Sequence, residues 1–121
     1  KHERLFKNLK NIKLVREAMF ASTNEIRGTS YASRIEDPKY QFAGKTGTSQ
    51  IVYKWKYEQG VGSTNGSFAW FVPAEDPKFV MIVKLERPRS SQYGGSTSAY
   101  MFSDIAKELL DYYSIPKKTQ K

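Results

Sequence analysis

The segment FAGKTGTSQIVY, residues 42–53, decides the fold of this chain. Apolar or β-prone residues flank it on both sides, with Phe42-Ala43 before and Ile51-Val52-Tyr53 after. This pattern predicts a strand over about residues 40–53. The middle of the strand carries a cation, hydroxyls and glycines instead of core residues. A strand edge with these groups suits an anionic peptide ligand, which can add as an extra strand through main-chain hydrogen bonds.

Side chains alternate along a strand, so Lys45, Gly47 and Ser49 are expected on one face and Thr46 and Thr48 on the other. Gly47 lacks a Cβ and would let a partner approach the backbone closely. The backbone N–H of Thr48 would be placed to point at a developing oxyanion. Lys45 would supply positive potential for a carboxylate and assist proton transfer from a neighbouring serine.

The rest of the sequence predicts two helices and two further strands. Helical stripes and apolar runs place them, in chain order, as a helix over 11–22, strands over 67–72 and 79–85 joined by a turn over 74–78, and a helix over 98–113. The strand over 79–85 is apolar almost throughout, so we expect it to be buried on both faces. Hairpin-length links predict an antiparallel three-stranded meander with helices packed on one face, an α+β fold.

Composition narrows the class of protein. The chain has 121 residues, a net charge of +8 and no cysteine, which excludes disulfides and thiolate metal sites. The basic residues gather in an N-terminal segment, residues 1–10, and in a tail, residues 117–121, on either side of the predicted domain over 11–116. They act either as solvated tails or as a surface for anionic partners.

Several landmarks, in this order, resemble the C-terminal part of class B penicillin-binding proteins, members of the penicillin-recognising serine acyltransferases. Lys-Thr-Gly is one signature element of that family. The resemblance covers about residues 11–116 and rests on Gly28-Thr29, Ala43-Gly44-Lys45-Thr46-Gly47-Thr48-Ser49-Gln50, Ser67-Phe68-Ala69, Pro73-Ala74 and Tyr93-Gly94-Gly95.

This resemblance implies a peptidoglycan D,D-transpeptidase that β-lactams inhibit and that needs no cofactor or metal. Lys45 would sit beside the catalytic serine, and Thr46 and Thr48 would bind the carboxylate of the D-Ala-D-Ala stem peptide or of the antibiotic. The Thr48 N–H would form half of the oxyanion hole, Gly47 would leave room for the acyl chain, and Ser49 would complete the substrate-binding strand. The parent protein is expected to be membrane-anchored, at the extracytoplasmic face of the bacterial plasma membrane.

Two elements of the family pattern are missing. The nucleophile element Ser-x-x-Lys and the Ser-x-Asn element should precede Lys-Thr-Gly, and letter matches such as residues 22–24, 63–65 and 114–117 occur in the wrong places. We therefore expect a fragment that is inactive alone, whose partner is the remainder of the transpeptidase domain. Without that partner the apolar third strand would have an open edge and the fold would be marginal.

A different class of function stays open on composition alone. Many lysines, arginines and tyrosines also fit a basic, aromatic-rich module that binds nucleic acid or another anionic polymer. The transpeptidase reading expects no nucleic-acid partner and places the strand aromatics Phe42, Phe68, Phe71 and Phe79 in the core. Tight, salt-dependent binding of a single-stranded oligonucleotide would favour the module.

Overall fold

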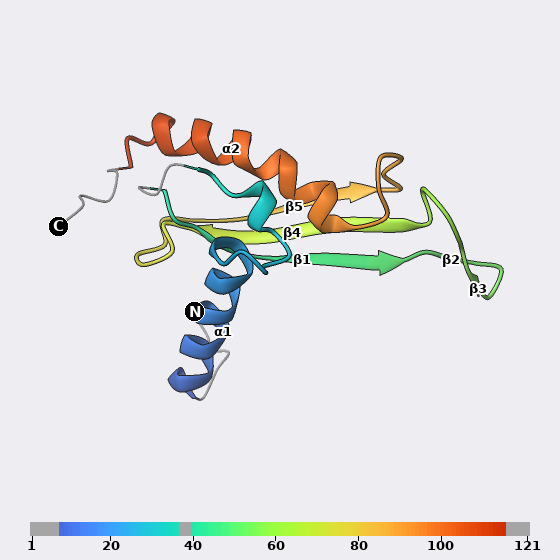
Figure 1. Cartoon of the computed structure of the whole chain (residues 1–121), viewed down its shortest axis with the longest axis horizontal. Helices are drawn as coiled ribbons and strands as arrows, with labels where there is room; N and C mark the ends of the chain where they lie inside the picture. Colours follow the sequence, from blue (N-terminus) through green and yellow to red (C-terminus); the bar gives the residue numbers. More distant parts are fainter. Residues whose placement is uncertain (1–7, 37–39, 116–121) are drawn as a thin grey trace, which may run out of the picture.

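The computed structural model describes residues 8–36 and 40–115, shown in Figure 1. Its elements, in chain order, are α1 (Leu9–Asn24), η1 (Tyr31–Ser33), β1 (Ala43–Gln50), β2 (Val52–Tyr53), β3 (Lys56–Tyr57), β4 (Thr64–Val72), β5 (Phe79–Glu86), η2 (Gly94–Ser96) and α2 (Ser98–Tyr112). The predicted tail over 117–121 and most of the predicted basic segment over 1–10 lie outside the described residues. Within the described ranges, neither helix is long and apolar enough to cross a bilayer.

Three strands form one antiparallel sheet in the order β1-β4-β5, which confirms the predicted meander and the α+β class. The predicted first strand was too long, because the chain leaves the sheet after Gln50 and forms a separate ribbon from β2 and β3. The second strand begins at Thr64, three residues before its predicted start. Its polar first residues looked like a loop, but they pair with the end of β1 on one side and with Leu85 and Glu86 on the other.

The core lies between α2 and one face of the sheet. Alternate residues of β4, namely Phe68, Trp70 and Val72, are buried there. The ring of Phe102 on α2 sits 4.1 Å from that of Phe42 and 4.4 Å from that of Trp70, measured between centroids. This arrangement confirms the predicted helical stripe, and Ala106 and Leu110 bury the next turns of the same face. Of the strand aromatics expected in the core, Phe42 and Phe68 are fully buried, whereas Phe71 and Phe79 are half-buried.

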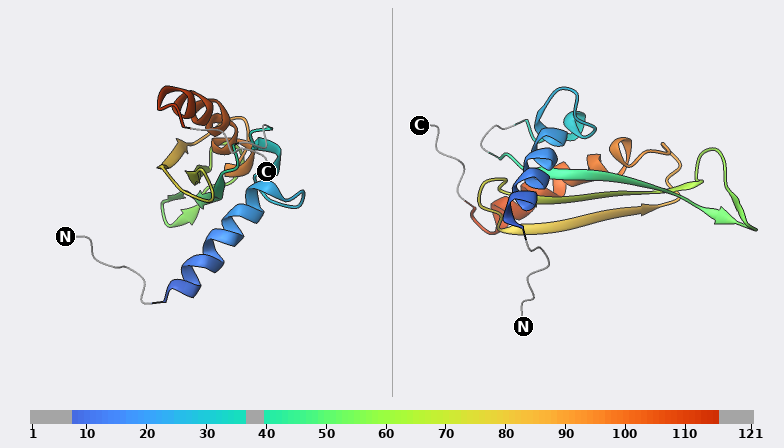
Figure 2. Two further views of the ribbon diagram at one scale, coloured as in Figure 1. Left: turned by 90° about the vertical axis from the view of Figure 1, so that its left-hand side faces the viewer. Right: turned by 90° about the horizontal axis from the view of Figure 1, so that it is seen from below.

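The prediction that the third strand is buried on both faces is wrong. Its residues alternate between half-buried and exposed, and Val80 and Ile82 are 79% and 67% exposed. The physical reason is that α2 covers only one face, while α1 packs mainly along β1 and then diverges from the sheet (Figures 1 and 2). The predicted helix layer is therefore α2 alone over β4 and β5. β5 is also an outer strand of the three-stranded sheet, which leaves an apolar face and an unpaired edge at this end.

We predict that Phe102→Ala lowers the free energy of unfolding by about 3–5 kcal/mol, because it removes a ring that touches three buried aromatics. Denaturant titration followed by tryptophan fluorescence measures this loss, since Trp70 lies against the ring. Tyr112→Ala is the matched control, because Tyr112 is an exposed aromatic on the same helix. Equal losses for the two variants would contradict the assigned core.

Candidate functional site

The outer edge of β1 carries the groups that the sequence singled out. β1 pairs residue for residue with β4, Lys45 opposite Ala69 and Gly47 opposite Ser67. Directly after β1, the Ile51 N–H donates to the Ser63 carbonyl of the neighbouring chain segment. Since hydrogen-bonded positions alternate along an antiparallel pair, the odd-numbered residues of β1 direct their backbone groups toward β4. Even-numbered residues therefore direct theirs outward, and the carbonyl of Phe42 does so, accepting bonds from α1. The backbone N–H and C=O groups of Thr46 and Thr48 thus point away from the sheet.

Lys45 and Thr46 come together at this edge. The Lys45 side chain starts on the face away from α2 and bends over the edge, where its Nζ donates to the Thr46 carbonyl at 2.8 Å. The same Nζ lies 3.3 Å from the Thr46 hydroxyl. Lys45 is exposed and forms no ion pair with a described acid, so its charge is available to an anion.

Thr48 lies on the other face and is held by the loop before α2. The Gly94 N–H donates to Thr48 Oγ1 at 3.0 Å. A side chain at position 94 would collide with the Gly47 carbonyl, so the close approach of this loop to β1 requires glycine. Because the Gly94 bond uses a lone pair of the hydroxyl oxygen, the Thr48 hydroxyl proton remains free to donate to a ligand.

A third segment supports Thr46. The turn after α1 folds back on the helix, with Ser30 N–H donating to the Ser22 carbonyl at 3.1 Å. Gly28 touches the backbone of that last helical turn so closely that a Cβ would overlap the Ser22 carbonyl. The turn brings the Thr29 hydroxyl within 3.2 Å of the Ser22 hydroxyl and 3.3 Å of the Thr46 hydroxyl. Four polar groups therefore run in a chain from Ser22 to Lys45.

A groove of about 480 Å³ lies beside this chain, between α1 and β1. It has two cations and no carboxylate among its lining residues, which are Val15, Ala18, Met19, Ser22, Arg27, Gly28, Thr29 and Lys45. A larger hollow of about 640 Å³ on another side of α1 carries charges of both signs, and Arg16 reaches from it to the Ala74 and Glu75 carbonyls. Of these two hollows among the described residues, the smaller groove is the one that offers positive charge without a carboxylate next to hydroxyl donors.

Two predicted substrate residues have lesser roles in this geometry. Gly47 and Ser49 lie on the Lys45 face, as the alternation predicted. A Cβ on Gly47 would meet the Ser67 hydroxyl, so glycine keeps this face of the strand edge free of side-chain bulk. Ser49 is exposed and makes no side-chain hydrogen bond with the described part of the chain.

The letter matches to Ser-x-Asn have structural roles. Thr23 Oγ1 and Asn24 Nδ2 both donate to the Phe42 carbonyl, at 2.9 and 2.8 Å, and fasten α1 to the start of β1. In the second match, Thr64 donates to the Gln92 carbonyl, and Asn65 accepts from the Arg87 N–H. Residues 116 and 117 of the Ser-x-x-Lys letter match lie outside the described residues.

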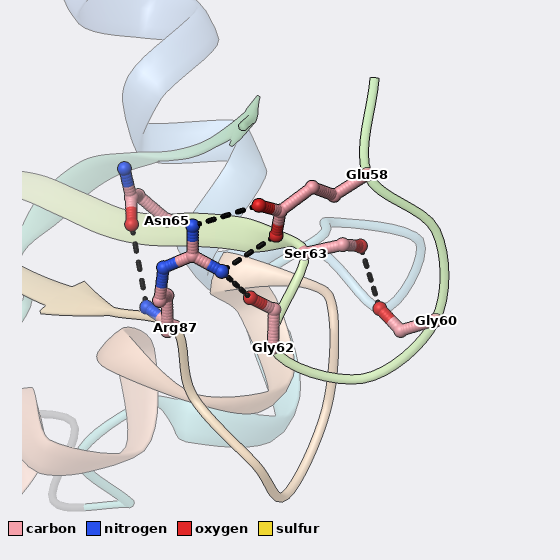
Figure 3. A network of polar contacts seen from close by, with 6 residues as sticks. All are labelled: Glu58, Gly60, Gly62, Ser63, Asn65 and Arg87. Carbon is pink, nitrogen blue, oxygen red and sulfur yellow. Dashed lines mark hydrogen bonds and ion pairs between the residues drawn. The ribbon is translucent and has the colours of Figure 1, made fainter. Parts of the chain in front are cut away.

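An ion pair fixes the far end of the sheet (Figure 3). The Arg87 guanidinium bonds both carboxylate oxygens of Glu58, at 2.5 and 3.0 Å, and also the Gly62 carbonyl at 3.1 Å. Arg87 follows β5 and opens the loop that ends at Gly94, whereas Glu58 closes the β2–β3 ribbon. The Arg87 hydrogen bond lowers the pKa of Glu58 below its ordinary value.

Sequence reasoning missed two of these contributors, Thr29 and Gly94. Both belong to landmarks of the family resemblance, but no site role was assigned to them. The glycines beside or at these positions were the available signal, because glycine often marks a close backbone approach. What the sequence could not supply was which strand residue each approached.

Comparison with known proteins identifies the family of this chain. The family profile described as "Penicillin binding protein transpeptidase domain" matches residues 2–107. Stage V sporulation protein D of Bacillus subtilis strain 168 is 35% identical over 83 residues, which are 67% of this chain and 12% of that protein. Penicillin-binding protein PbpB of Mycolicibacterium smegmatis is 34% identical over 95 residues, 74% of this chain and 14% of that protein.

A solved structure shares the fold. Penicillin binding protein 3 of Mycobacterium tuberculosis, complexed with ampicillin, aligns with a TM-score of 0.74 at 27% identity, over 92% of this chain and 26% of that one. The chain belongs to the penicillin-binding protein transpeptidase domain family. It spans about an eighth of the length of the first curated relatives that it matches.

We predict that Arg87→Met raises the pKa of Glu58 toward its ordinary value, because the variant removes the hydrogen bond that lowers it. The pair stabilises the fold above the ordinary carboxyl pKa, and this contribution is lost as the pH falls through the lowered pKa. NMR titration of the Glu58 side-chain carboxyl measures the change. Lys84→Met is the control, since Lys84 pairs with Glu86 instead; an unchanged Glu58 titration in Arg87→Met would refute the assignment.

Proposed function

We propose that this chain supplies the strand edge of a peptidoglycan D,D-transpeptidase active site, where the terminal carboxylate of a stem peptide or of a β-lactam docks. The observation that carries the proposal is the open edge of β1. There the outward backbone groups of Thr46 and Thr48, two threonine hydroxyls and the Lys45 ammonium converge. The relatives named peptidoglycan D,D-transpeptidases support the reaction class.

The roles follow from hydrogen-bond direction. Lys45 and Gly94 donate to the two threonine hydroxyl oxygens, and with Thr29 as the donor to Thr46 both threonine hydroxyl protons are left to donate to a carboxylate. The positive potential of Lys45 adds a charge-assisted interaction with the same anion. Thr29 is a positioning residue, because it touches the Thr46 hydroxyl without lying on the strand edge itself.

The reaction is acyl transfer to a serine that another part of the domain supplies. Serine Oγ attacks the carbonyl carbon of the penultimate D-Ala, and the negative charge that develops on the carbonyl oxygen meets the outward Thr48 N–H. The terminal D-Ala leaves with a proton and its C–N bond breaks. An amine of a second stem peptide then displaces the serine. Lys45 holds the departing carboxylate in place and favours deprotonation of a nearby hydroxyl.

The parent protein would act at the bacterial cell envelope, with the exposed face of β5 covered by the remainder of the transpeptidase domain. Val80 and Ile82 form an apolar surface that a folded domain would bury, and a further strand paired with β5 would satisfy the open edge of the sheet. The basic-module alternative would rest on the exposed lysines and aromatic residues of the β2–β3 ribbon, residues 53–57, which lie outside the edge of β1 that carries the proposal.

In the complete transpeptidase, we predict that Lys45→Met lowers the second-order rate of acylation by benzylpenicillin about 100-fold or more, because it removes the cation that binds the carboxylate. Thr29→Val lowers it by about tenfold or less, and Thr29→Ser restores the rate, since the serine keeps the hydroxyl. Stopped-flow acylation with reporter substrates measures both. Lys107→Met, which changes an exposed lysine on α2, is the control. An unchanged rate in Lys45→Met would contradict the proposed site.

We also predict that the isolated chain forms no covalent adduct with a fluorescent penicillin, because acylation needs the serine nucleophile that this segment lacks. Denaturing gel electrophoresis followed by mass spectrometry measures labelling. The complete transpeptidase is the positive control. A covalent adduct on the isolated chain, mapped to one serine, would overturn the assignment of the nucleophile to another segment.

A further inference from the structure

The β2–β3 ribbon extends beyond the end of β1 (Figure 1). Its aromatic side chains are exposed to solvent. Its strands pair Val52 with Tyr57 and Tyr53 with Lys56, and all four residues are exposed. Trp55 at the tip is 98% exposed. Within the described ranges neither face of the ribbon packs on the body of the protein, so these aromatics contribute nothing to the core.

The turn at the tip is not chosen for local stability. Its two central residues, Lys54 and Trp55, have φ angles of 47° and 66°. A two-residue turn of this kind favours Asn-Gly, because left-handed backbone is unfavourable for other residues. An exposed tryptophan at a strained turn indicates recognition of a partner more than folding.

The ribbon is also positively charged. Lys54 and Lys56 form no ion pair with a described acid. The nearest acid in the sequence, Glu58, is held by Arg87 at the base of the ribbon (Figure 3). The tip therefore combines cations that no acid neutralises with apolar aromatic surfaces.

The ribbon follows directly from the proposed binding edge. A peptide that pairs antiparallel with β1, with its terminal carboxylate at Thr46 and Thr48, runs its amino end toward Gln50 and the ribbon. From Thr48 to the tip the chain covers about 20 Å at strand spacing. A bound peptide of four or five residues spans roughly 13–17 Å. Whatever is attached to its amino end therefore reaches the ribbon.

Resting on the proposed function, we propose that the β2–β3 ribbon binds the glycan portion of the donor strand. Peptidoglycan stem peptides are attached to the sugar through their amino end. The apolar faces of sugar rings and their N-acetyl groups fit against Trp55 and Tyr53, and Lys54 and Lys56 attract the acidic groups of neighbouring stem peptides. The ribbon makes the enzyme favour glycan-linked donors over free peptides.

The test compares two donors in the complete transpeptidase: uncrosslinked glycan strands with stem peptides, and the same stem peptide without sugar. The variant Lys54→Asn/Trp55→Gly places Asn-Gly at the turn, so the ribbon itself is retained. We expect kcat/KM for glycan strands to fall about three- to tenfold. We expect kcat/KM for the free peptide and the rate of acylation by benzylpenicillin to stay unchanged. Trp55→Tyr keeps most of the wild-type preference for glycan strands. Tyr112→Ala, which removes an exposed aromatic on α2, leaves kcat/KM unchanged for both donors.

Equal losses for both donors would overturn the proposal, because the ribbon would then act on the catalytic edge. Unchanged turnover of both donors would also overturn it. A third outcome would also overturn it: the variant turns over glycan strands at the unchanged rate but no longer binds phosphatidylglycerol vesicles. That result would assign the ribbon to a lipid surface. Co-sedimentation with insoluble peptidoglycan distinguishes failure of the glycan contact from failure of the proposed function. Reduced binding by the variant supports the glycan contact even if the wild-type enzyme resists acylation, an outcome that would refute only the proposed function.

Discussion

The one-to-one antiparallel pairing of β1 with β4 is the constraint on which the site depends. Because the backbone groups of Lys45, Gly47 and Ser49 are used in pairing with β4, those of Thr46 and Thr48 have to face outward. A shift of one residue would exchange the two sets and turn each side chain to the opposite face. The position of the cation, the direction of the Thr48 N–H and the approach of the Gly94 loop therefore all follow from a single register.

The core fixes that register. Phe68 of β4 lies across Gly44 of β1 so closely that any side chain at position 44 would overlap its ring. The same ring packs 5.3 Å from Phe102, so α2 presses on the strand directly before the lysine. Near the other end of this pairing, Gly66 of β4 lies opposite Thr48 and is confined by the hydroxyls of Thr97 and Ser98. Glycines thus let the aromatic layer and the polar edge share one thin sheet.

The sequence predicted the parts of the structure that depend on local pattern. The Lys45-to-Ser49 alternation, the buried stripe of α2 and the order of strands follow from side-chain periodicity and turn residues. It failed at β5, where an apolar run was assigned to two buried faces although one face has no cover among the residues that the structure describes. It also missed Thr29, whose place depends on how a turn 16 residues before Lys45 folds back against α1. Both errors concern contacts between segments distant in sequence, which periodicity does not encode.

The hydrogen bond from Lys45 Nζ to the Thr46 carbonyl has a consequence for how a ligand enters. The ammonium thereby caps the Thr46 carbonyl, so a strand that added along this edge would find its outward backbone acceptor at Thr48. Its amide and its acid group would then meet different groups of β1, the amide at the Thr48 carbonyl and the acid at the cation and the threonine hydroxyls. A molecule that offers only an anion, or only an extended amide, would make half of these contacts.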